Sequence, residues 1–192
     1  MALLSSQIAV ELREIVLRDK PASMLEYSPK GTVPVLVLSD GRVIDESRDI
    51  VSWALEQHDP EELLRADRVQ IKQLIDQNDG DFKASLDRYK YADRYPEKTM
   101  AEYRSDGEQF LAVLEQRLGD HGFLIDDKPT LADIAIFPFI RQFAFVDKPW
   151  FDQSQYKNLQ LWLIGFLESV PFERCMQKRP PWQPGDTTVV FQ

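Results

Sequence analysis

Residues 28–50 read Ser-Pro-Lys-Gly-Thr-Val-Pro-Val-Leu-Val-Leu-Ser-Asp-Gly-Arg-Val-Ile-Asp-Glu-Ser-Arg-Asp-Ile, and they decide the fold of the first part of the chain. Two apolar runs, 33–38 and 43–44, flank the dipeptide Asp40-Gly41. This pattern predicts a β-hairpin, because Asp-Gly adopts the positive φ angles that tight turns between strands require. A helix with Ile50 on its apolar face is predicted to follow over residues 46–57.

The segment before this hairpin predicts one further strand and one short helix. Residues 8–17 alternate between apolar and charged side chains at first and then become continuously apolar, which favours a strand. Residues 21–27 follow Pro21 and favour a short helical turn. Residues 1–57 therefore predict a small α/β domain.

After His58-Asp59-Pro60 the pattern becomes helical. Thr130 and Asp133 form a predicted capping box that opens an unusually apolar, and hence buried, helix over 134–143, which Pro138 is expected to kink. The other expected helices cover 61–90, 97–118 with Gly119 as the residue that ends it, 155–169 and 171–178. The predicted organisation is an α/β domain over 1–57, an all-helical domain over 61–180 and a C-terminal tail over 181–192.

Composition excludes several classes of function. The net charge of −9 argues against a nucleic-acid partner, because phosphate binding depends on Lys and Arg. Cys175 is the single cysteine, so no internal disulfide can form and a reducing, cytoplasmic compartment is expected. No apolar run approaches the roughly 18 residues that a membrane span needs. His58 and His121 lie far apart, and no metal site is predicted.

The chain contains, in this order, the motifs Lys20-Pro21, Gly31-x-Val33-Pro34, Asp45-Glu46-Ser47 and Thr130-x-x-Asp133. Taken together, these motifs resemble the cytosolic glutathione transferases over nearly the whole chain. The closest likeness is to the omega-like and bacterial cysteine-type members, through Lys20-Pro21 and residues 81–91. The resemblance implies an α+β fold with a thioredoxin-like N-terminal domain and an all-α C-terminal domain, glutathione as co-substrate, and a homodimer.

The chemistry of glutathione matches the residue types at the motif positions. Its γ-glutamyl carboxylate needs N–H donors, which the helix N-terminus at Ser47 offers, and its ammonium needs an anion such as Glu46. The alternative for Ser47 is that it only caps the helix. The resemblance implies that the backbone of Val33, before a cis Pro34, pairs with the extended tripeptide. Lys20 matches the position that binds the glycyl carboxylate, although an exposed lysine is also expected to be merely solvated.

Three residues from the helical half are candidates for a substrate pocket. Asn78 lies on an otherwise apolar helix face, where an unpaired amide is costly. Tyr89 and Arg141 could line the same pocket. The alternative for all three is an ordinary structural hydrogen bond between domains.

No catalytic residue is predicted in this sequence. The family activates a thiolate with a Tyr, Ser or Cys between the first strand and the first helix, whereas Met-Ala-Leu-Leu-Ser-Ser resembles the last turns of that helix. We therefore expect the first strand and the catalytic segment to be missing, since Ser5 and Ser6 lie at the wrong end and Cys175 reads as a buried small side chain. Without that first strand, the strand at 8–17 lacks a hydrogen-bond partner. Three alternatives follow: the natural protein is longer, another chain supplies the missing strand, or the remaining strands pair directly with each other.

Three functional hypotheses follow. The first is a glutathione transferase-like protein whose lineage conjugates glutathione to small electrophiles or reduces glutathione mixed disulfides, with activity impaired by the missing segment. The second is a non-catalytic interaction or scaffold protein with the same fold. The third is a helical protein with an incidental hairpin.

Overall fold

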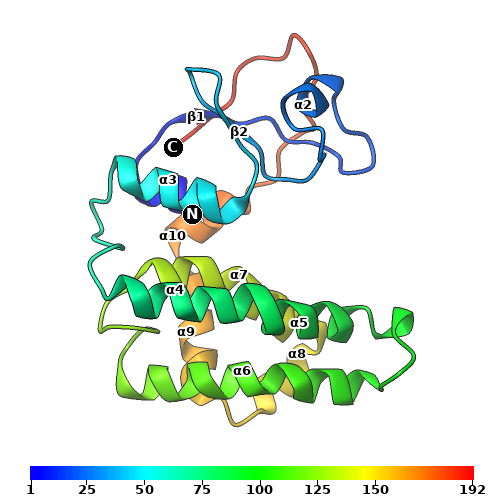
Figure 1. Ribbon diagram of the computed structural model, residues 1–192, viewed down its shortest axis with the longest axis vertical. Helices are drawn as coiled ribbons and strands as arrows, with labels where there is room; N and C mark the ends of the chain where they lie inside the picture. The colour runs from blue at the N-terminus through cyan, green and yellow to red at the C-terminus, as the bar shows by residue number, and fades with distance from the viewer. The chain divides into compact units, whose positions relative to one another are not determined.

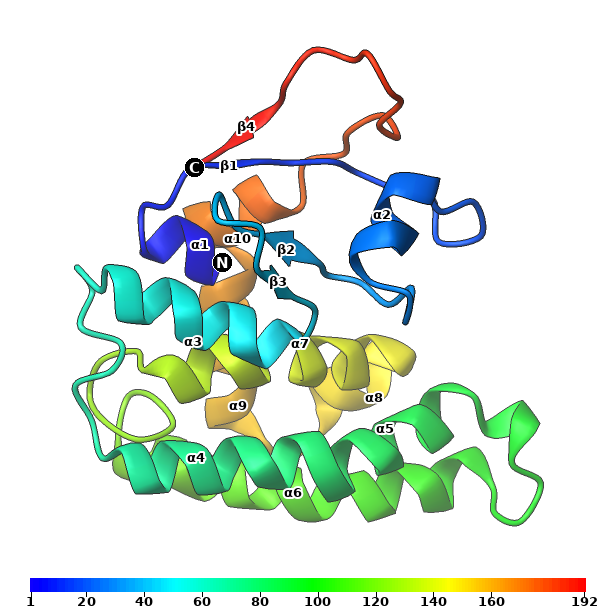
Figure 2. The same cartoon turned by 45° about the horizontal axis from the view of Figure 1, so that its top comes forward.

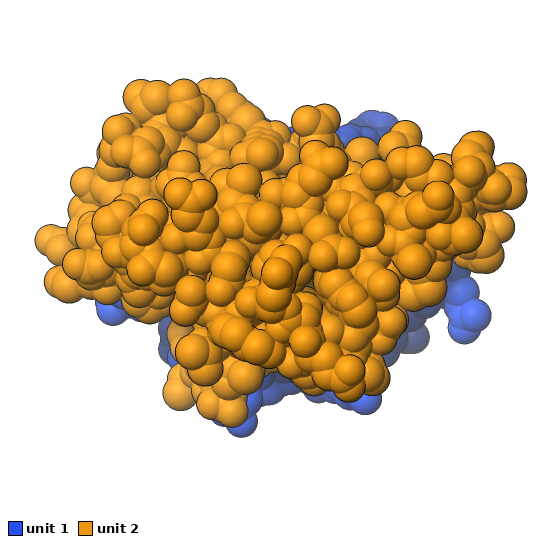
Figure 3. Space-filling model, turned by 90° about the horizontal axis from the view of Figure 1, so that it is seen from below, with its two compact units in different colours: residues 1–61, 173–192 blue, residues 62–172 orange.

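The computed structural model describes residues 1–192 and divides into two compact units. The first unit contains Met1–Glu61 together with Glu173–Gln192, and the second contains Glu62–Phe172; Figure 3 colours them separately. The sequence predicted that the helical domain would extend to residue 180. The structure instead assigns residues 173–192 to the first unit, where the end of the chain pairs with an N-terminal strand.

The first unit contains two separate two-stranded sheets, both antiparallel. In one, β1 (Val10–Glu11) pairs with β4 (Val190–Phe191), so the two ends of the chain lie side by side (Figure 2). In the other, β2 (Leu36–Val37) pairs with β3 (Val43–Ile44). The strand regions 8–17 and 33–38 do not pair with each other, so direct pairing of the strands, one of the three alternatives, does not occur.

Both long strand predictions were too long. Of residues 8–17 only β1 forms a strand, and of residues 33–38 only β2 does. A strand is defined by its hydrogen-bonded partner, and each partner here contributes only two residues. The hairpin itself is confirmed, since Gly41 has a φ of +86° and Leu38 N–H donates to the Arg42 carbonyl over 2.8 Å.

Three short helices of the first unit precede or follow these strands. Helix α1 (Ala2–Ser5) begins the chain, and α2 (Ala22–Tyr27) follows Pro21 as predicted. Helix α3 (Ser47–Gln57) also agrees with prediction and buries Ile50, Ala54 and Leu55. Helix α10 (Val170–Cys175) spans the boundary between the units.

The second unit is entirely helical. The expected helix over 61–90 begins only at Arg68, because the Asp67 carboxylate caps it by accepting from Val69 N–H over 2.8 Å. It is also interrupted by a π-helical segment around Gly80. Figures 1 and 2 show α4 and α5 following one another alongside α6. The elements are α4 (Arg68–Gln77), the π-helical η1 (Asn78–Phe82), α5 (Lys83–Lys90), the 3-10 turn η2 (Ala92–Arg94), α6 (Met100–Asp120), α7 (Leu131–Val146), α8 (Lys148–Gln153) and α9 (Lys157–Leu167).

The capping box at the start of α7 is confirmed, and its carboxylate has a wider role than predicted. Asp133 Oδ2 accepts from the Thr130 N–H and hydroxyl, both over 2.8 Å. Asp133 Oδ1 accepts from Leu124 N–H over 3.0 Å and from Trp162 Nε1–H over 2.9 Å. A single buried carboxylate therefore joins α7 to the preceding loop and to α9.

The end of α6 and the path of α7 are two further features of the second unit. Helix α6 continues through Gly119 and ends at Asp120, so Gly119 does not terminate it. Pro138 lies inside α7, which continues on both sides of it. None of the helices combines the length and the apolar character that crossing a bilayer requires.

Candidate functional site

A buried serine connects the loop after α2 to the residues before α3. Ser28 is 1% exposed, and its hydroxyl donates to Asp45 Oδ2 over 2.9 Å. Its carbonyl accepts from Gly31 N–H over 2.9 Å, which closes the loop 28–31. These two bonds hold the loop next to the N-terminus of α3.

The side chain of Lys20 lies next to Gly31 in the same loop. Gly31 has a φ of +64°, a conformation in which a side chain is strained. A Cβ atom at this position would lie 3.3 Å from Leu25 Cδ2 and 3.7 Å from Lys20 Cδ. The aliphatic part of Lys20 thus packs beside the loop, and its ammonium makes no hydrogen bond or ion pair.

The N-terminus of α3 presents an uncapped first turn. Glu46 has extended backbone angles, and its carbonyl accepts from Ile50 N–H over 3.0 Å. No side chain caps this helix, and the exposed Ser47 is its first residue. The alternative that Ser47 serves as the helix cap is therefore wrong. The first-turn N–H groups have no intrahelical partner and offer a site for an anion.

The Glu46 carboxylate has a partner that the sequence did not indicate. It forms an exposed ion pair with the Lys30 ammonium, and this hydrogen bond raises the pKa of Lys30. Lys30 lies in a polar loop sixteen positions before Glu46. Since no local pattern links residues at that separation, no signal in the sequence could have revealed the pair.

Val33 and Pro34, between the loop 28–31 and the hairpin, leave backbone groups without hydrogen-bond partners. The Val33–Pro34 peptide bond is cis, as the resemblance implied. Val33 is 46% exposed, and its N–H and carbonyl make no hydrogen bond within the chain. All five predicted glutathione-binding positions thus belong to the first unit. Lys20 packs beside the loop 28–31, and Glu46 and Ser47 lie at the start of α3.

The three predicted pocket residues lie in the second unit and share no hydrogen bond or ring contact with one another. Asn78 is fully buried, and its amide donates to Asp79 Oδ1 over 2.9 Å while its own oxygen has no partner. Tyr89 is 1% exposed and packs against Phe143 at 4.8 Å between ring centroids. Burial raises the pKa of Tyr89, and the Arg104 guanidinium opposes this shift.

Arg141 has aromatic rather than ionic neighbours. Its guanidinium lies 5.3 Å from the ring centroid of Phe145 and 5.4 Å from that of Phe172. The Arg141 Nε has no hydrogen-bond partner. Its role in a substrate pocket stays a prediction.

No nucleophile is placed at the site. Ser5 and Ser6 are buried, and Ser6 is only 1% exposed. Cys175 is half-buried in α10, where its sulfur accepts a hydrogen bond from the N-terminal ammonium of Met1 over 3.2 Å. Its expected position in the last helical stretch is correct, although it is less buried than a core side chain.

Comparison with known proteins defines the family. Residues 1–62 match the model of the glutathione S-transferase N-terminal domain, and residues 97–164 match that of the C-terminal domain. Together these matches cover more than half of the chain. The chain belongs to the glutathione S-transferase family.

Solved structures share the fold. A ternary complex of BphK, a bacterial glutathione transferase, is 24% identical, with a TM-score of 0.73 over 90% of this chain and 88% of that one. A glutathione S-transferase from Methylobacillus flagellatus KT, solved with glutathione bound, is 21% identical, with a TM-score of 0.75 over 90% and 89%.

One curated relative matches this chain over only part of the relative's own length. Elongation factor 1-gamma of Drosophila melanogaster is 25% identical over 157 residues, which make up 78% of this chain and 35% of that protein. The chain thus spans about a third of the length of this relative.

Proposed function

We propose that the first unit binds glutathione at the N-terminus of α3 and the adjoining loop. The observation that carries this proposal is the uncapped first turn at Ser47, which lies directly beside the Glu46 carboxylate. An α-amino acid end carries a carboxylate and an ammonium on one carbon, so it fits a helix N-terminus next to an anion. Structures of two relatives that carry reduced or oxidised glutathione support this choice of ligand.

The remainder of the tripeptide has matching partners along the same segment. The free N–H and carbonyl of Val33 are suited to pair with an extended peptide backbone, as an added strand would. The Lys20 ammonium, which has no partner in the chain, is suited to the glycyl carboxylate. In this proposal Lys30 competes with the ligand ammonium for Glu46.

The proposed activity is that of the lineage: conjugation of glutathione to small electrophiles, or reduction of glutathione mixed disulfides. None of the placed residues is suited to activate the thiol, so we expect glutathione binding with little turnover from residues 1–192 alone. The second candidate is a non-catalytic interaction or scaffold protein, which the same lack of a placed nucleophile favours. By family likeness we also propose an omega-like subtype and a cytoplasmic homodimer.

Replacing Lys20 with alanine tests the assignment of the glycyl end. The variant is expected to bind glutathione about fivefold to tenfold more weakly in isothermal titration calorimetry, because a charge-assisted hydrogen bond is lost at a partly exposed site. A glutathione analogue with an amidated glycyl carboxylate should bind the variant and the unaltered protein equally. Lys83→Ala, an exposed change in the second unit, is the control. Equal loss for both ligands would place Lys20 elsewhere in the site.

A further inference from the structure

Two cations lie over the ring of Tyr91, directly after α5. The Lys90 ammonium is 5.0 Å from the ring centroid, and the guanidinium carbon of Arg94, in η2, is 4.4 Å from it. Attraction to a ring face holds a cation in position, but the ring has no net charge that could neutralise it. Asp93 in the same turn is exposed and forms no ion pair with either cation. Both cations are therefore held in place and still able to bind an anion.

A hydrogen bond links the surroundings of Tyr91 to a second aromatic side chain, on α7. Lys90 Nζ donates to Gln142 Oε1 over 3.1 Å, where α5 packs against α7. Phe145 lies three residues after Gln142 on the same helix, a spacing that places two side chains next to each other on one face. Tyr91 and Phe145 thus belong to one surface of the second unit.

Phe145 is also flanked by two cations, and it is open to solvent. Its side chain belongs to a residue that is 51% exposed. The guanidinium carbon of Arg141 is 5.3 Å from its ring centroid, and the ammonium of Lys148 is 5.9 Å from it. Lys148 forms an ion pair with Asp152, whereas Arg141 has no acidic partner. An exposed ring beside an unpaired guanidinium offers apolar contact and positive charge together.

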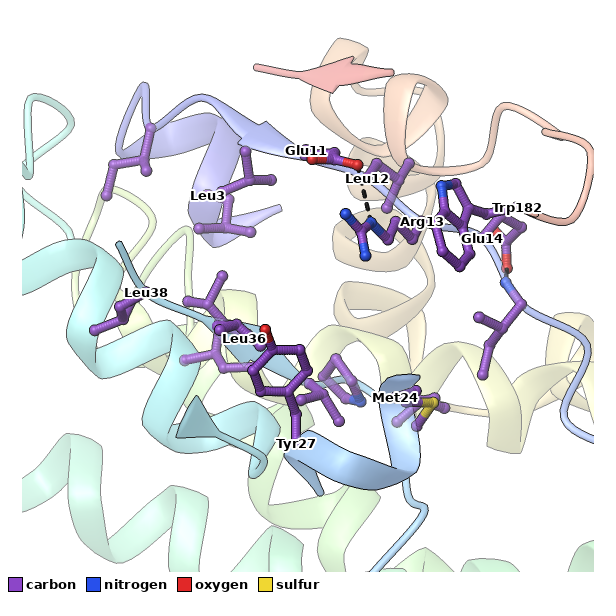
Figure 4. A pocket seen from close by; sticks show the side chains of 18 of the residues that line it. Leu3, Glu11, Leu12, Arg13, Glu14, Met24, Tyr27, Leu36, Leu38 and Trp182 are labelled. Atoms are coloured by element: carbon purple, nitrogen blue, oxygen red, sulfur yellow. Dashed lines mark hydrogen bonds and ion pairs between the residues drawn. The ribbon is translucent and has the colours of Figure 1, made fainter. Parts of the chain in front are cut away.

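The other cations that lie over aromatic rings already have carboxylate partners. In the first unit, Arg13 lies over Trp182 and donates to Glu11 over 2.9 Å, as Figure 4 shows. In the second unit, the cations paired in the same way are Arg104 with Asp147, Lys98 with Asp106 and Lys148 with Asp152. The cations over rings that lack a carboxylate are Lys90, Arg94 and Arg141. All three belong to the surface around Tyr91 and Phe145.

The charge of the whole chain makes these unpaired cations informative. Acidic side chains outnumber basic ones, with a net charge of −9, yet three cations on one surface have no acid as a partner. Carboxylates form short, charge-assisted hydrogen bonds with Lys and Arg. Because the rings already restrict these cations, binding an anion costs less side-chain entropy. The surface therefore suits a ligand with several carboxylates and an apolar group between them.

We propose that the surface formed by Lys90, Tyr91, Arg94, Arg141 and Phe145, here called the basic-aromatic patch, binds an acidic segment of a partner protein. Carboxylates of the segment pair with Lys90 and Arg94 at one end and with Arg141 at the other, and an apolar side chain between them covers Phe145. The net charge of −9 repels a long polyanion such as a nucleic acid, whereas a short acidic segment brings few charges. The patch shares no residue with the proposed glutathione site, so either proposal can fail without the other.

The test uses the full chain and a synthetic peptide in which paired Glu residues flank a single Trp. Titration calorimetry should show saturable binding that weakens as sodium chloride is added, because salt screens exposed charges. Lys90→Gln combined with Arg94→Gln should weaken binding roughly tenfold, since two charged contacts at an exposed site are lost. Lys83→Gln removes an exposed cation of α5 that lies over no ring, and it should leave the affinity unchanged. No binding of the peptide, or an equal loss in Lys83→Gln, would overturn the proposal.

Two comparisons identify what the patch recognises. Phe145→Ala should weaken binding of the Trp peptide roughly threefold to fivefold and should not affect a peptide with Gly in place of Trp, because only the contact between rings is removed. A peptide with Gln in place of every Glu should show no detectable binding, and equal binding of that peptide would contradict the proposal. Tighter binding of single-stranded oligothymidylate than of the Glu peptide would also overturn it, and would identify nucleic acid as the occupant.

Discussion

Replacing Asp133 with alanine is expected to lower the free energy of unfolding of the second unit by about 3–5 kcal/mol. The carboxylate is fully buried and accepts from four donors, from Thr130, Leu124 and Trp162. Removing it leaves these donors without a partner in the interior, where each unsatisfied group costs roughly 1–3 kcal/mol. Urea unfolding followed by far-ultraviolet circular dichroism measures the change.

Two variants make this prediction specific. Asp120→Ala removes an exposed carboxylate at the end of α6, and its effect should stay within about 0.5 kcal/mol. Asp133→Asn keeps the shape and one acceptor oxygen but places an NH₂ group opposite other donors. Its loss of unfolding free energy should therefore lie between those of Asp133→Ala and Asp120→Ala. An Asp133→Ala variant as stable as Asp120→Ala would show that the carboxylate does not hold the second unit together.

Replacing Glu46 with glutamine is expected to weaken glutathione binding by roughly tenfold or more. The change removes the carboxylate directly before Ser47 at the start of α3, and the ligand ammonium loses its charged partner. Hydrogen bonds to charged groups contribute about 1.5–3 kcal/mol, and exposure reduces this value. Titration calorimetry measures the affinity.

The matched variant is Lys30→Gln, which should act in the opposite direction. It removes the ammonium that pairs with Glu46 in the free protein and so frees the carboxylate for the ligand. We expect affinity for glutathione to stay equal or to rise. If Lys30→Gln weakens binding as much as Glu46→Gln, then Lys30 is part of the ligand contacts and the Glu46 assignment is wrong.

Local patterns predicted the local structure. The Asp40-Gly41 hairpin, the helix after Glu46 and the Thr130–Asp133 capping box each depend on residues a few positions apart, and all three are present. The glutathione transferase fold followed from the order of such motifs. Their agreement is expected, because turn and capping chemistry acts over one or two turns of chain.

Contacts between distant residues could not be predicted. The partner of β1 is the C-terminal pair Val190–Phe191, far away in the chain, so the length of the strand at 8–17 was overestimated. The bond from Trp162 to Asp133 and the ion pair of Lys30 with Glu46 likewise join residues that no periodicity relates. Of the site, the sequence indicated the residue types but not which of them are already paired.

The most direct test of the proposed glutathione site is a calorimetric titration of the unaltered chain with glutathione, repeated with Ser47→Ala. We expect saturable binding at one site per chain, and a loss of about fivefold in the variant, because the hydrogen bond of the Ser47 hydroxyl, roughly 1 kcal/mol at the first turn of α3, is removed. Ser105→Ala, exposed on α6, should bind as the unaltered chain does. No detectable binding of glutathione, or equal affinity in Ser47→Ala, would contradict the assignment of this site.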